Sequence, residues 1–371
     1  MRQIGLGTFE STPKMQHLVR QVLESNRLSY GPMSQEFESR FAVLHDCQYG
    51  VLSNSGTSSL LVALQTLKEL YGWQDGDEVI VSALTFVASV NIILQCNLKP
   101  VLADVEDDFY GINPELTMKA ITKKTRAIIP VHTFGQPCDM YTLRKWYYAE
   151  NGDHPMKWIE DSCESMLVKH MDKSIGYGSD IACFSTYAAH ILVTGVGGMS
   201  TTDNPEYALY MRSLVNHGID LEGLPTGESY EPTWLARKFR FTKVGHSVRL
   251  TKLEAAIGLA QLDDLPAIIR KRQENAAYLI MGLKPYEEYL QLPAIRPNTE
   301  HAFMMLVLVC RQEGVRDKLC RHLEQNGIGT RLALPLVSQP VYKGLWNPDD
   351  YPVAKWMDVN AFYIGCHQNL N

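Results

Sequence analysis

The chain has 371 residues, 45% of them hydrophobic and 20% charged, which is typical of a soluble globular protein large enough for two domains. Its formal net charge of −6 and isoelectric point near 6.0 argue against a nucleic-acid-binding protein, which usually has a basic face. The N-terminal residues lack the apolar core of a signal peptide, and no segment approaches the roughly 18 apolar residues of a membrane span. We therefore expect a cytoplasmic protein that binds neither nucleic acid nor membrane.

The cysteines are scattered along the chain and include no CxC or CxxC pair. The sequence therefore predicts neither a disulfide framework nor a zinc or iron–sulfur site, and we expect reduced thiols and no metal. The eight residues are Cys47, Cys96, Cys138, Cys163, Cys183, Cys310, Cys320 and Cys366.

Short apolar runs rich in β-branched residues recur from about residue 48, and helical segments separate several of them. This alternation is typical of a mostly parallel sheet with crossover helices, so the sequence predicts the α/β class. The runs are YGVLS, EVIVS, KPVLADV, RAIIPV, KWIED and IACFS.

The pattern changes after about residue 245. Residues 249–283 predict one long helical run with a kink near Pro266. Residues 301–310 predict a strand, and residues 315–331 predict an amphipathic helix that ends in an Asn-Gly turn. We therefore expect a large α/β domain over residues 1–245 and a smaller α+β domain over residues 246–371.

Ligands of open parallel sheets bind beyond the carboxyl ends of the strands, so the residues that follow each run are the first candidates for a site. After YGVLS comes NSGTSS, with Gly56, which opens a helix whose free N–H groups and hydroxyls suit a phosphate. The alternative is that Thr57 or Ser58 merely caps the helix, and for this motif alone capping is the favoured interpretation.

Two further strand ends carry candidates for the recognition of a ring. Phe86 follows EVIVS and can either stack on a flat ring or pack in the core. Asp161 ends KWIED, and a buried carboxylate needs a partner such as a cationic ring nitrogen. The alternative is that Asp161 and Glu164 form a helix-capping box.

The last strand of this series is followed by Ser185, a second candidate for a phosphate ligand, and five residues later by His190. For a lone histidine in apolar sequence, a packed side chain is the favoured interpretation. Taken together, however, the strand-end residues are those that a phosphorylated pyridine cofactor would use.

The sequence resembles the DegT/DnrJ/StrS family of pyridoxal-phosphate (PLP) enzymes, which contains sugar aminotransferases and their dehydratase relatives. The resemblance implies the aspartate-aminotransferase fold (fold type I) and a homodimer with shared active sites. The motifs that carry it are LSYGPMSQEFESRFA, SNSGTSSL, ALTFVAS, PVLADVE, IIPVHTFGQPCDM, IEDSCES, CFSTYAAHILVTGVGGM, LVNHGID, RLTKLEAAIGLAQL and NGIGTR.

The resemblance assigns roles to the strand-end residues. Asp161 would pair with the ring nitrogen of the cofactor and keep it protonated, Phe86 would stack on the ring, and Glu164 stands where the family often has Gln or His near the ring hydroxyl. The residues implied to hold the cofactor phosphate are Gly56, Thr57, Ser58 and Ser185.

Three more assignments follow from the resemblance. Ser247 stands in VGHSVRL where the family usually has an asparagine that reaches the phosphate in the neighbouring subunit. Tyr30 belongs to a SYGP loop that approaches the substrate in the family, and Arg331 is a candidate contact for an anionic group of the substrate.

His190 is the main departure from the family pattern, because family aminotransferases have at this position a lysine that is bonded to the cofactor. No lysine occurs between Lys173 and Lys238. An imidazole cannot replace that bond, but it can act as an acid or base near neutral pH. Sugar 3-dehydratases form a branch of the family that has histidine here. Val196 also replaces the usual glutamate of the glycine turn, and the sequence does not explain this change.

The resemblance therefore implies a 3-dehydratase of a nucleotide-linked 4-keto-6-deoxy sugar, active in deoxysugar synthesis such as that of lipopolysaccharide O-antigens. Pyridoxamine phosphate (PMP) would be its working cofactor, and an amino acid such as glutamate would regenerate it. A related dehydrase of CDP-sugars uses a four-cysteine iron–sulfur cluster, but the cysteine spacing here favours the cluster-free version. The alternatives are an aminotransferase for a sugar or non-sugar keto substrate, a non-catalytic binder of PLP or nucleotide sugars, and a Lys→His variant of an aminotransferase.

Overall fold

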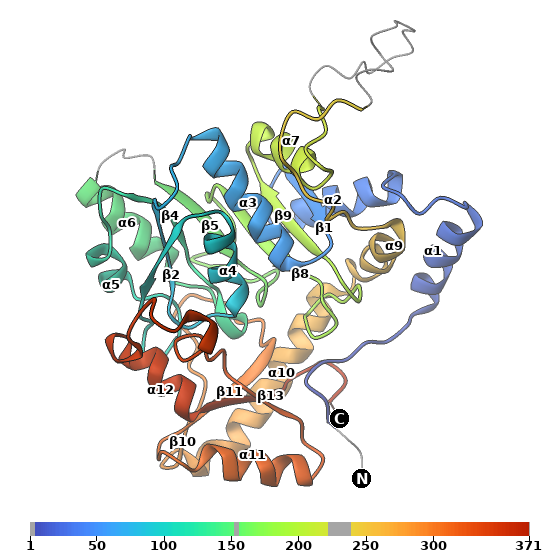
Figure 1. The fold of residues 1–371 in the computed structure, drawn as a ribbon. Helices are drawn as coiled ribbons and strands as arrows, with labels where there is room; N and C mark the ends of the chain where they lie inside the picture. The colour runs from blue at the N-terminus through green and yellow to red at the C-terminus, as the bar shows by residue number, and fades with distance from the viewer. Residues whose placement is uncertain (1–3, 152–155, 222–238, 371) are drawn as a thin grey trace, which may run out of the picture.

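The computed structural model describes residues 4–151, 156–221 and 239–370, and its centre is a seven-stranded sheet (Figure 1). The strand order is β1-β9-β8-β5-β4-β2-β3. β9 is antiparallel to both of its neighbours, and the other neighbouring pairs are parallel, so the prediction of a mostly parallel sheet is confirmed. The strands are β1 (Tyr49–Ser53), β2 (Glu78–Ser82), β3 (Lys99–Ala103), β4 (Thr125–Ile129), β5 (Lys157–Asp161), β8 (Ile181–Ser185) and β9 (Gly198–Thr202).

Helices cover both faces of this sheet, because successive strand residues point to opposite faces and both sets are apolar. In β5, for example, Ile159 belongs to the core under α3 and α4, whereas Trp158 packs in a second core with Leu143 and Tyr147 of α6. Figure 1 shows α3 and α4 in front of the sheet. The helices of this part are α3 (Gly56–Leu70), α4 (Val87–Gln95), α5 (Pro114–Lys119), α6 (Met140–Asn151) and α7 (Pro205–Leu214), with the 3-10 turn η1 (Thr133–Gly135).

The helical run expected over residues 249–283 with a kink near Pro266 is two separate helices, and the interruption lies just before that proline. α9 (Lys252–Gln261) packs against α1 (Pro13–Glu24) and α2 (Pro32–Leu44). Three residues separate it from α10 (Leu265–Leu283), which runs in a different direction. Pro266 is the second residue of α10, in the first turn, where its missing N–H leaves no helical hydrogen bond unmade.

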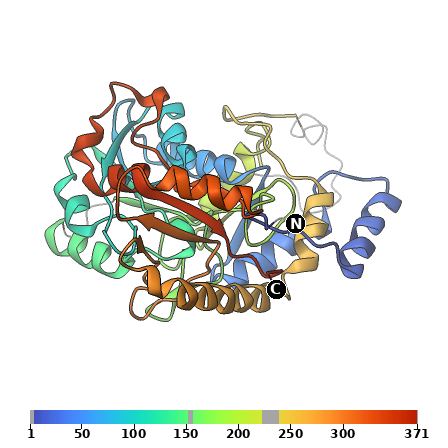
Figure 2. The ribbon, with the colours of Figure 1, turned by 90° about the horizontal axis from the view of Figure 1, so that it is seen from below.

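A smaller antiparallel sheet lies below the large one in Figure 1, and Figure 2 shows α11 lying across it. Its strand order is β10 (Leu290–Gln291), β11 (Met305–Cys310), β13 (Ala361–Gly365) and β12 (Thr330–Leu332). The strand predicted from residue 301 therefore begins only at residue 305, whereas the amphipathic helix is confirmed as α11 (Arg316–Gln325). α12 (Pro352–Asn360) and the short turns η2 (Lys284–Tyr286), η3 (Pro340–Tyr342) and η4 (Pro348–Asp350) complete this part.

Two short strands, β6 (Lys169–His170) and β7 (Lys173–Ser174), form a hairpin between β5 and β8. Within the described parts of the chain, no helix is both long and apolar enough to cross a lipid bilayer.

Candidate active site

The first turn of α3 is capped by Ser55, whose Oγ accepts a hydrogen bond from the backbone N of Ser58 at 3.1 Å. The interpretation of Thr57 or Ser58 as the cap was therefore wrong, because the cap lies two residues before Thr57 and three before Ser58. Ser58 instead donates its hydroxyl to Asn54 Oδ1 at 2.7 Å, and Thr57 lies exposed in the first turn. Ser55 thus orders the turn and leaves the Thr57 hydroxyl at the surface.

Gly56 and Ser185 lie against each other, although they come from the ends of two different strands. A Cβ added to Gly56 would lie 2.8 Å from Ser185 Cβ and 2.7 Å from Cys163 Sγ, which is closer than real Cβ contacts. Glycine at position 56 therefore allows the side chains of Ser185 and Cys163 to approach the start of α3 this closely. This contact brings the residues that follow β1, β5 and β8 together at the N-terminus of α3, where free N–H groups suit a phosphate.

Asp161 is a buried carboxylate at the end of β5. Its Oδ2 accepts the hydroxyl of Ser89 at 2.6 Å, and Ser89 shares a second hydrogen bond of 2.8 Å with Thr85 Oγ1. No helix begins after β5, so the capping-box interpretation of Asp161 and Glu164 was wrong. Within the described residues no lysine or arginine lies within ion-pair distance of Asp161, so a cationic ring nitrogen would give this carboxylate a partner.

Glu164 lies three residues beyond Asp161, and its Oε2 accepts a hydrogen bond from the backbone N of Phe134 at 2.6 Å. Burial raises the pKa of Glu164 to about 7. The charge of Glu164 also acts on Tyr363 of β13, which pairs in register with Arg331 of β12. Tyr363, which no sequence motif marks, is therefore close enough to both Glu164 and Arg331 to be affected by their charges.

His190 lies in the loop between β8 and β9, and its backbone N donates to Tyr187 O at 2.9 Å. Burial lowers the pKa of the His190 imidazole to about 4, the positive charge of Arg272 acts in the same direction, and a backbone hydrogen bond with Cys163 opposes them. The imidazole is therefore neutral at pH 7. Its Nδ1 is buried without a partner in the described parts of the chain, whereas a packed structural histidine normally has its nitrogens satisfied.

The glycine turn after His190 joins this loop to α3. Gly195 and Gly197 have φ angles of 93° and 151°, which favour glycine, and a Cβ on Gly198 would lie 2.3 Å from Ser55 O. Val196 between them is 50% exposed, and nothing in the structure explains why this residue is a valine.

Phe86 precedes α4 at the same edge of the sheet and is 60% exposed. Ser247 is also exposed and accepts a hydrogen bond from Arg249 Nη2 at 2.9 Å. The neighbouring Val248 O accepts from Asn54 N at 2.7 Å, so the segment that carries Ser247 runs beside the loop before α3.

Tyr30 takes part in a separate cluster. Its hydroxyl donates to Glu38 Oε2 at 2.6 Å and accepts from Arg212 Nη1 at 2.9 Å. Arg212 also forms an ion pair with Glu38 at 2.7 Å, so the Tyr30 side chain is held by α2 and α7. None of these contacts joins Tyr30 to Asp161 or His190.

The residues at this edge fit a phosphorylated pyridine. The glycine cradle with Ser185 suits the phosphate, the buried Asp161 suits the ring nitrogen, and the His190 nitrogen without a partner adds an acid–base group. The fold and the site define a PLP-dependent enzyme of fold type I. Residues 10–371 match the DegT/DnrJ/EryC1/StrS aminotransferase family, and the chain belongs to this family of sugar-modifying enzymes, as predicted.

Known relatives of the chain include both aminotransferases and dehydratases. An uncharacterised protein of Methanocaldococcus jannaschii is 33% identical over 341 residues, 90% of this chain and 85% of that protein. GDP-perosamine synthase of Caulobacter vibrioides is 31% identical over 346 residues, 92% of this chain and 87% of that protein. E. coli GDP-4-keto-6-deoxy-D-mannose-3-dehydratase, solved with bound hydrated PLP, has a TM-score of 0.89 at 25% identity and covers 99% of this chain and 96% of its own.

Proposed function

We propose that the protein removes the 3-hydroxyl of a nucleotide-linked 4-keto-6-deoxy sugar, with PMP as its working cofactor and glutamate as the amine donor. The observation that carries this proposal is His190, a neutral imidazole in a chain segment without lysine from residue 174 to residue 237. The resemblance in structure to the E. coli 3-dehydratase supports it.

The bound cofactor would supply an amine that condenses with the keto group and a ring that withdraws electrons. Asp161, oriented by Ser89, would hold the proton on the ring nitrogen. Gly56, Ser185 and the first turn of α3 would hold the phosphate. These residues would fix the position of the ring next to His190.

His190 would act first as a base and then as an acid. It would take a proton from the amine-bearing carbon of the cofactor and would then deliver that proton to the departing C3 hydroxyl, which leaves as water. The overall reaction is balanced, because glutamate is oxidised by two electrons to 2-oxoglutarate and ammonia while C3 of the sugar is reduced from CHOH to CH₂.

Aminotransfer is the second candidate, because GDP-perosamine synthase is 31% identical to this chain. An aminotransferase that depends on a cofactor-bonded lysine should yield a lysine adduct when the PLP-loaded protein is treated with borohydride. We expect no such adduct in this protein, and a His190→Lys variant provides the positive control. A covalent lysine adduct in the unaltered protein would contradict the proposed function.

Product analysis separates the remaining alternatives. We expect incubation with GDP-4-keto-6-deoxymannose and glutamate to give a 3-deoxy sugar, ammonia and 2-oxoglutarate. An amino sugar would instead support aminotransfer, and lack of turnover with GDP-, CDP- and dTDP-linked substrates would support a binding protein. The His190→Asn variant should bind PMP and lose elimination, so unchanged turnover in this variant would refute the role of His190.

We also propose that the protein is a homodimer whose active sites lie near the subunit interface. Tyr187 and Val196 of the His190 loop are 55% and 50% exposed in one chain, and Phe86 is 60% exposed at the same edge. A second copy of the chain would remove these apolar side chains from water. Sedimentation equilibrium should therefore give twice the mass of the chain, and a monomer would contradict the proposal.

A further inference from the structure

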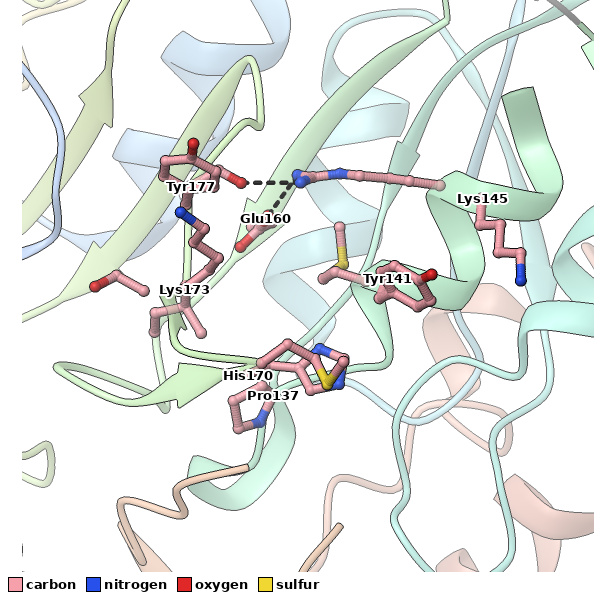
Figure 3. A pocket seen from close by; sticks show the side chains of 12 residues that line it. Pro137, Tyr141, Lys145, Glu160, His170, Lys173 and Tyr177 are labelled. Atoms are coloured by element: carbon pink, nitrogen blue, oxygen red, sulfur yellow. Dashed lines mark hydrogen bonds and ion pairs between the residues drawn. The ribbon is translucent and has the colours of Figure 1, made fainter. Parts of the chain in front are cut away.

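A cavity of about 320 Å³ lies on the opposite face of β5 from the candidate active site (Figure 3). Its walls come from helix α6, from the β6–β7 hairpin and from the turn that follows the hairpin. Successive strand residues point to opposite faces, so Glu160 faces this cavity while Asp161 faces the cofactor site. The cavity is therefore separate from the site described above, and nothing in the proposed reaction uses it.

Most of the cavity wall is apolar or aromatic. Met140 and Tyr141 belong to α6, and Met171, Ile175 and Tyr177 come from the hairpin and the turn after it. Tyr141, Met171 and Tyr177 are each about half exposed, at 55%, 46% and 45%, so the cavity opens to solvent between them. Its volume lies at the lower end of the range of about 300–1,000 Å³ that is typical of small-molecule sites.

The charged groups at the rim are predominantly cationic. Lys173 Nζ lies 4.4 Å from the centroid of the Tyr177 ring, and Lys145 Nζ lies 5.8 Å from that of Tyr141. Figure 3 shows these two pairs on opposite sides of the cavity. Neither ammonium group has a carboxylate within ion-pair distance in the parts of the chain that the structure describes.

The one acid in the wall cannot neutralise these lysines, because the carboxylate of Glu160 is already fully engaged. Its Oε2 accepts from His132 Nε2 at 2.9 Å and from Gly176 N at 2.5 Å, and its Oε1 accepts from Arg144 Nη2 at 3.1 Å and from Ser179 Oγ. Arg144, which also lines the cavity, keeps its Nε–H buried without an acceptor among the described residues. The wall thus offers the positive charge of the lysines and a free donor, while its one carboxylate is already engaged.

We propose that this cavity binds a compact aromatic molecule that carries one anionic group. The ring would lie among Tyr141, Met171 and Tyr177, and the anion would bind Lys173, with Lys145 on the opposite side. Aromatic and thioether side chains favour a flat ring, and two lysines without carboxylate partners favour a negative charge.

The proposal is tested with 2-naphthoate as the probe, titrated calorimetrically into the full-length protein that has been saturated with PLP. Saturation with PLP keeps the probe out of the phosphate cradle of the active site. We expect one saturable site with a dissociation constant below about 1 mM, and at least about fivefold weaker binding of the neutral isostere 2-naphthamide.

Substitutions in the cavity wall test whether the probe binds in the cavity. Lys173→Met keeps most of the aliphatic stem and removes the charge, so it should weaken 2-naphthoate binding about fivefold and leave 2-naphthamide unaffected. Tyr177→Leu should weaken the binding of both probes. Lys169→Met is the matched control, because Lys169 is exposed on the same hairpin and does not line the cavity. The His190→Asn variant should bind 2-naphthoate as the unaltered protein does.

Three outcomes would overturn the proposal: no saturable binding, equal affinity for the acid and the amide, or equal losses in Lys173→Met and Lys169→Met. Thermal melting of each variant checks that it is folded. If Lys173→Met does not fold, Lys145→Met tests the same charge preference from the opposite wall.

Discussion

Ser89 and Asp161 are joined by a hydrogen bond of 2.6 Å that connects the first turns of α4 to the end of β5. The two residues are 72 positions apart in the chain, yet Ser89 is the side chain that fixes the buried carboxylate proposed to hold the cofactor ring. Thr85 supports this contact through its own hydrogen bond to Ser89.

The Ser89→Ala substitution should weaken cofactor binding about tenfold, because a hydrogen bond to a charged group contributes about 1.5–3 kcal/mol. The measurement is a spectrophotometric titration of the apoprotein with PLP. Ser34→Ala is the matched control, since Ser34 is also a buried serine but its hydroxyl has no partner within the described residues. Equal affinities in the two variants would contradict the role of Ser89.

Gly56→Ala tests the cradle at the start of α3. The added methyl group would meet Ser185 and Cys163, so we expect a loss of about 1–3 kcal/mol in the free energy of unfolding together with a loss of PLP affinity. Gly282→Ala is the control: this residue lies in α10 with open space around its Cβ position, and alanine there should stabilise the helix by about 0.5–1 kcal/mol. Chemical denaturation with and without PLP measures both effects, and unaltered PLP binding by Gly56→Ala would show that the cradle is not the phosphate site.

Glu164 makes the free energy of unfolding of the apoprotein depend on pH. Burial raises the pKa of Glu164 from an ordinary value near 4.5 to about 7, so the folded protein holds this proton more tightly than the unfolded chain. Its contribution to the free energy of unfolding is therefore greatest below pH 4.5, falls as the pH rises to about 7, and stays lost above that value.

Glu164→Gln should remove this fall. The free energy of unfolding of the variant, relative to that of the unaltered protein, should therefore increase from about pH 5 to about pH 8. Urea denaturation of the apoprotein at both pH values measures the change. The exposed Glu288→Gln serves as the control and should show no such gain. A constant difference between Glu164→Gln and the unaltered protein at both pH values would show that Glu164 does not titrate in this range.

Replacement of Glu160 should lower the free energy of unfolding more than replacement of most other charged residues. Burial opposes its ionisation, but the hydrogen bond from His132 and the charge of Arg144 lower its pKa to about 2. The stabilisation is therefore fully present above pH 4.5 and is lost as the pH falls toward 2. Because removing one partner of a buried pair leaves the others unsatisfied, Glu160→Gln should cost about 3 kcal/mol in the free energy of unfolding at pH 7.

The exposed pair of Glu115 and Lys119 provides the comparison for Glu160. Glu115→Gln should leave the free energy of unfolding almost unchanged at pH 7, because solvent screens an exposed pair. Similar losses in the two variants, measured by urea denaturation, would show that the network around Glu160 adds no stability beyond an ordinary surface pair.

Much of the fold could be predicted because the strand signals are local. The apolar runs of β1, β2, β4, β5 and β8 stand at the predicted places, and the residues just beyond them meet at one edge, as a parallel sheet requires. A kink near Pro266 was predicted from the proline alone, but the helix is fully interrupted there, since α9 ends at Gln261 and α10 begins at Leu265.

The site was less predictable where its contacts join distant segments. Ser89 lies in the ALTFVAS motif but was given no role there, and Tyr363 lies in no motif. Each is brought to its partner by the pairing of strands or the crossing of a helix. The cap of α3 was misplaced by two or three residues because NSGTSS contains several hydroxyl side chains, and only the backbone geometry at Ser55 selects one of them.

The two-sided use of β5 limits how its length can vary. Deletion or insertion of one residue within this strand would turn Glu160 toward the cofactor edge and Asp161 toward α6, so the two carboxylates would exchange surroundings in a single step. Each would then lose its donors at once. We therefore expect insertions and deletions to be tolerated in the loops around the sheet. Within β5 (Lys157–Asp161) we expect them to prevent folding.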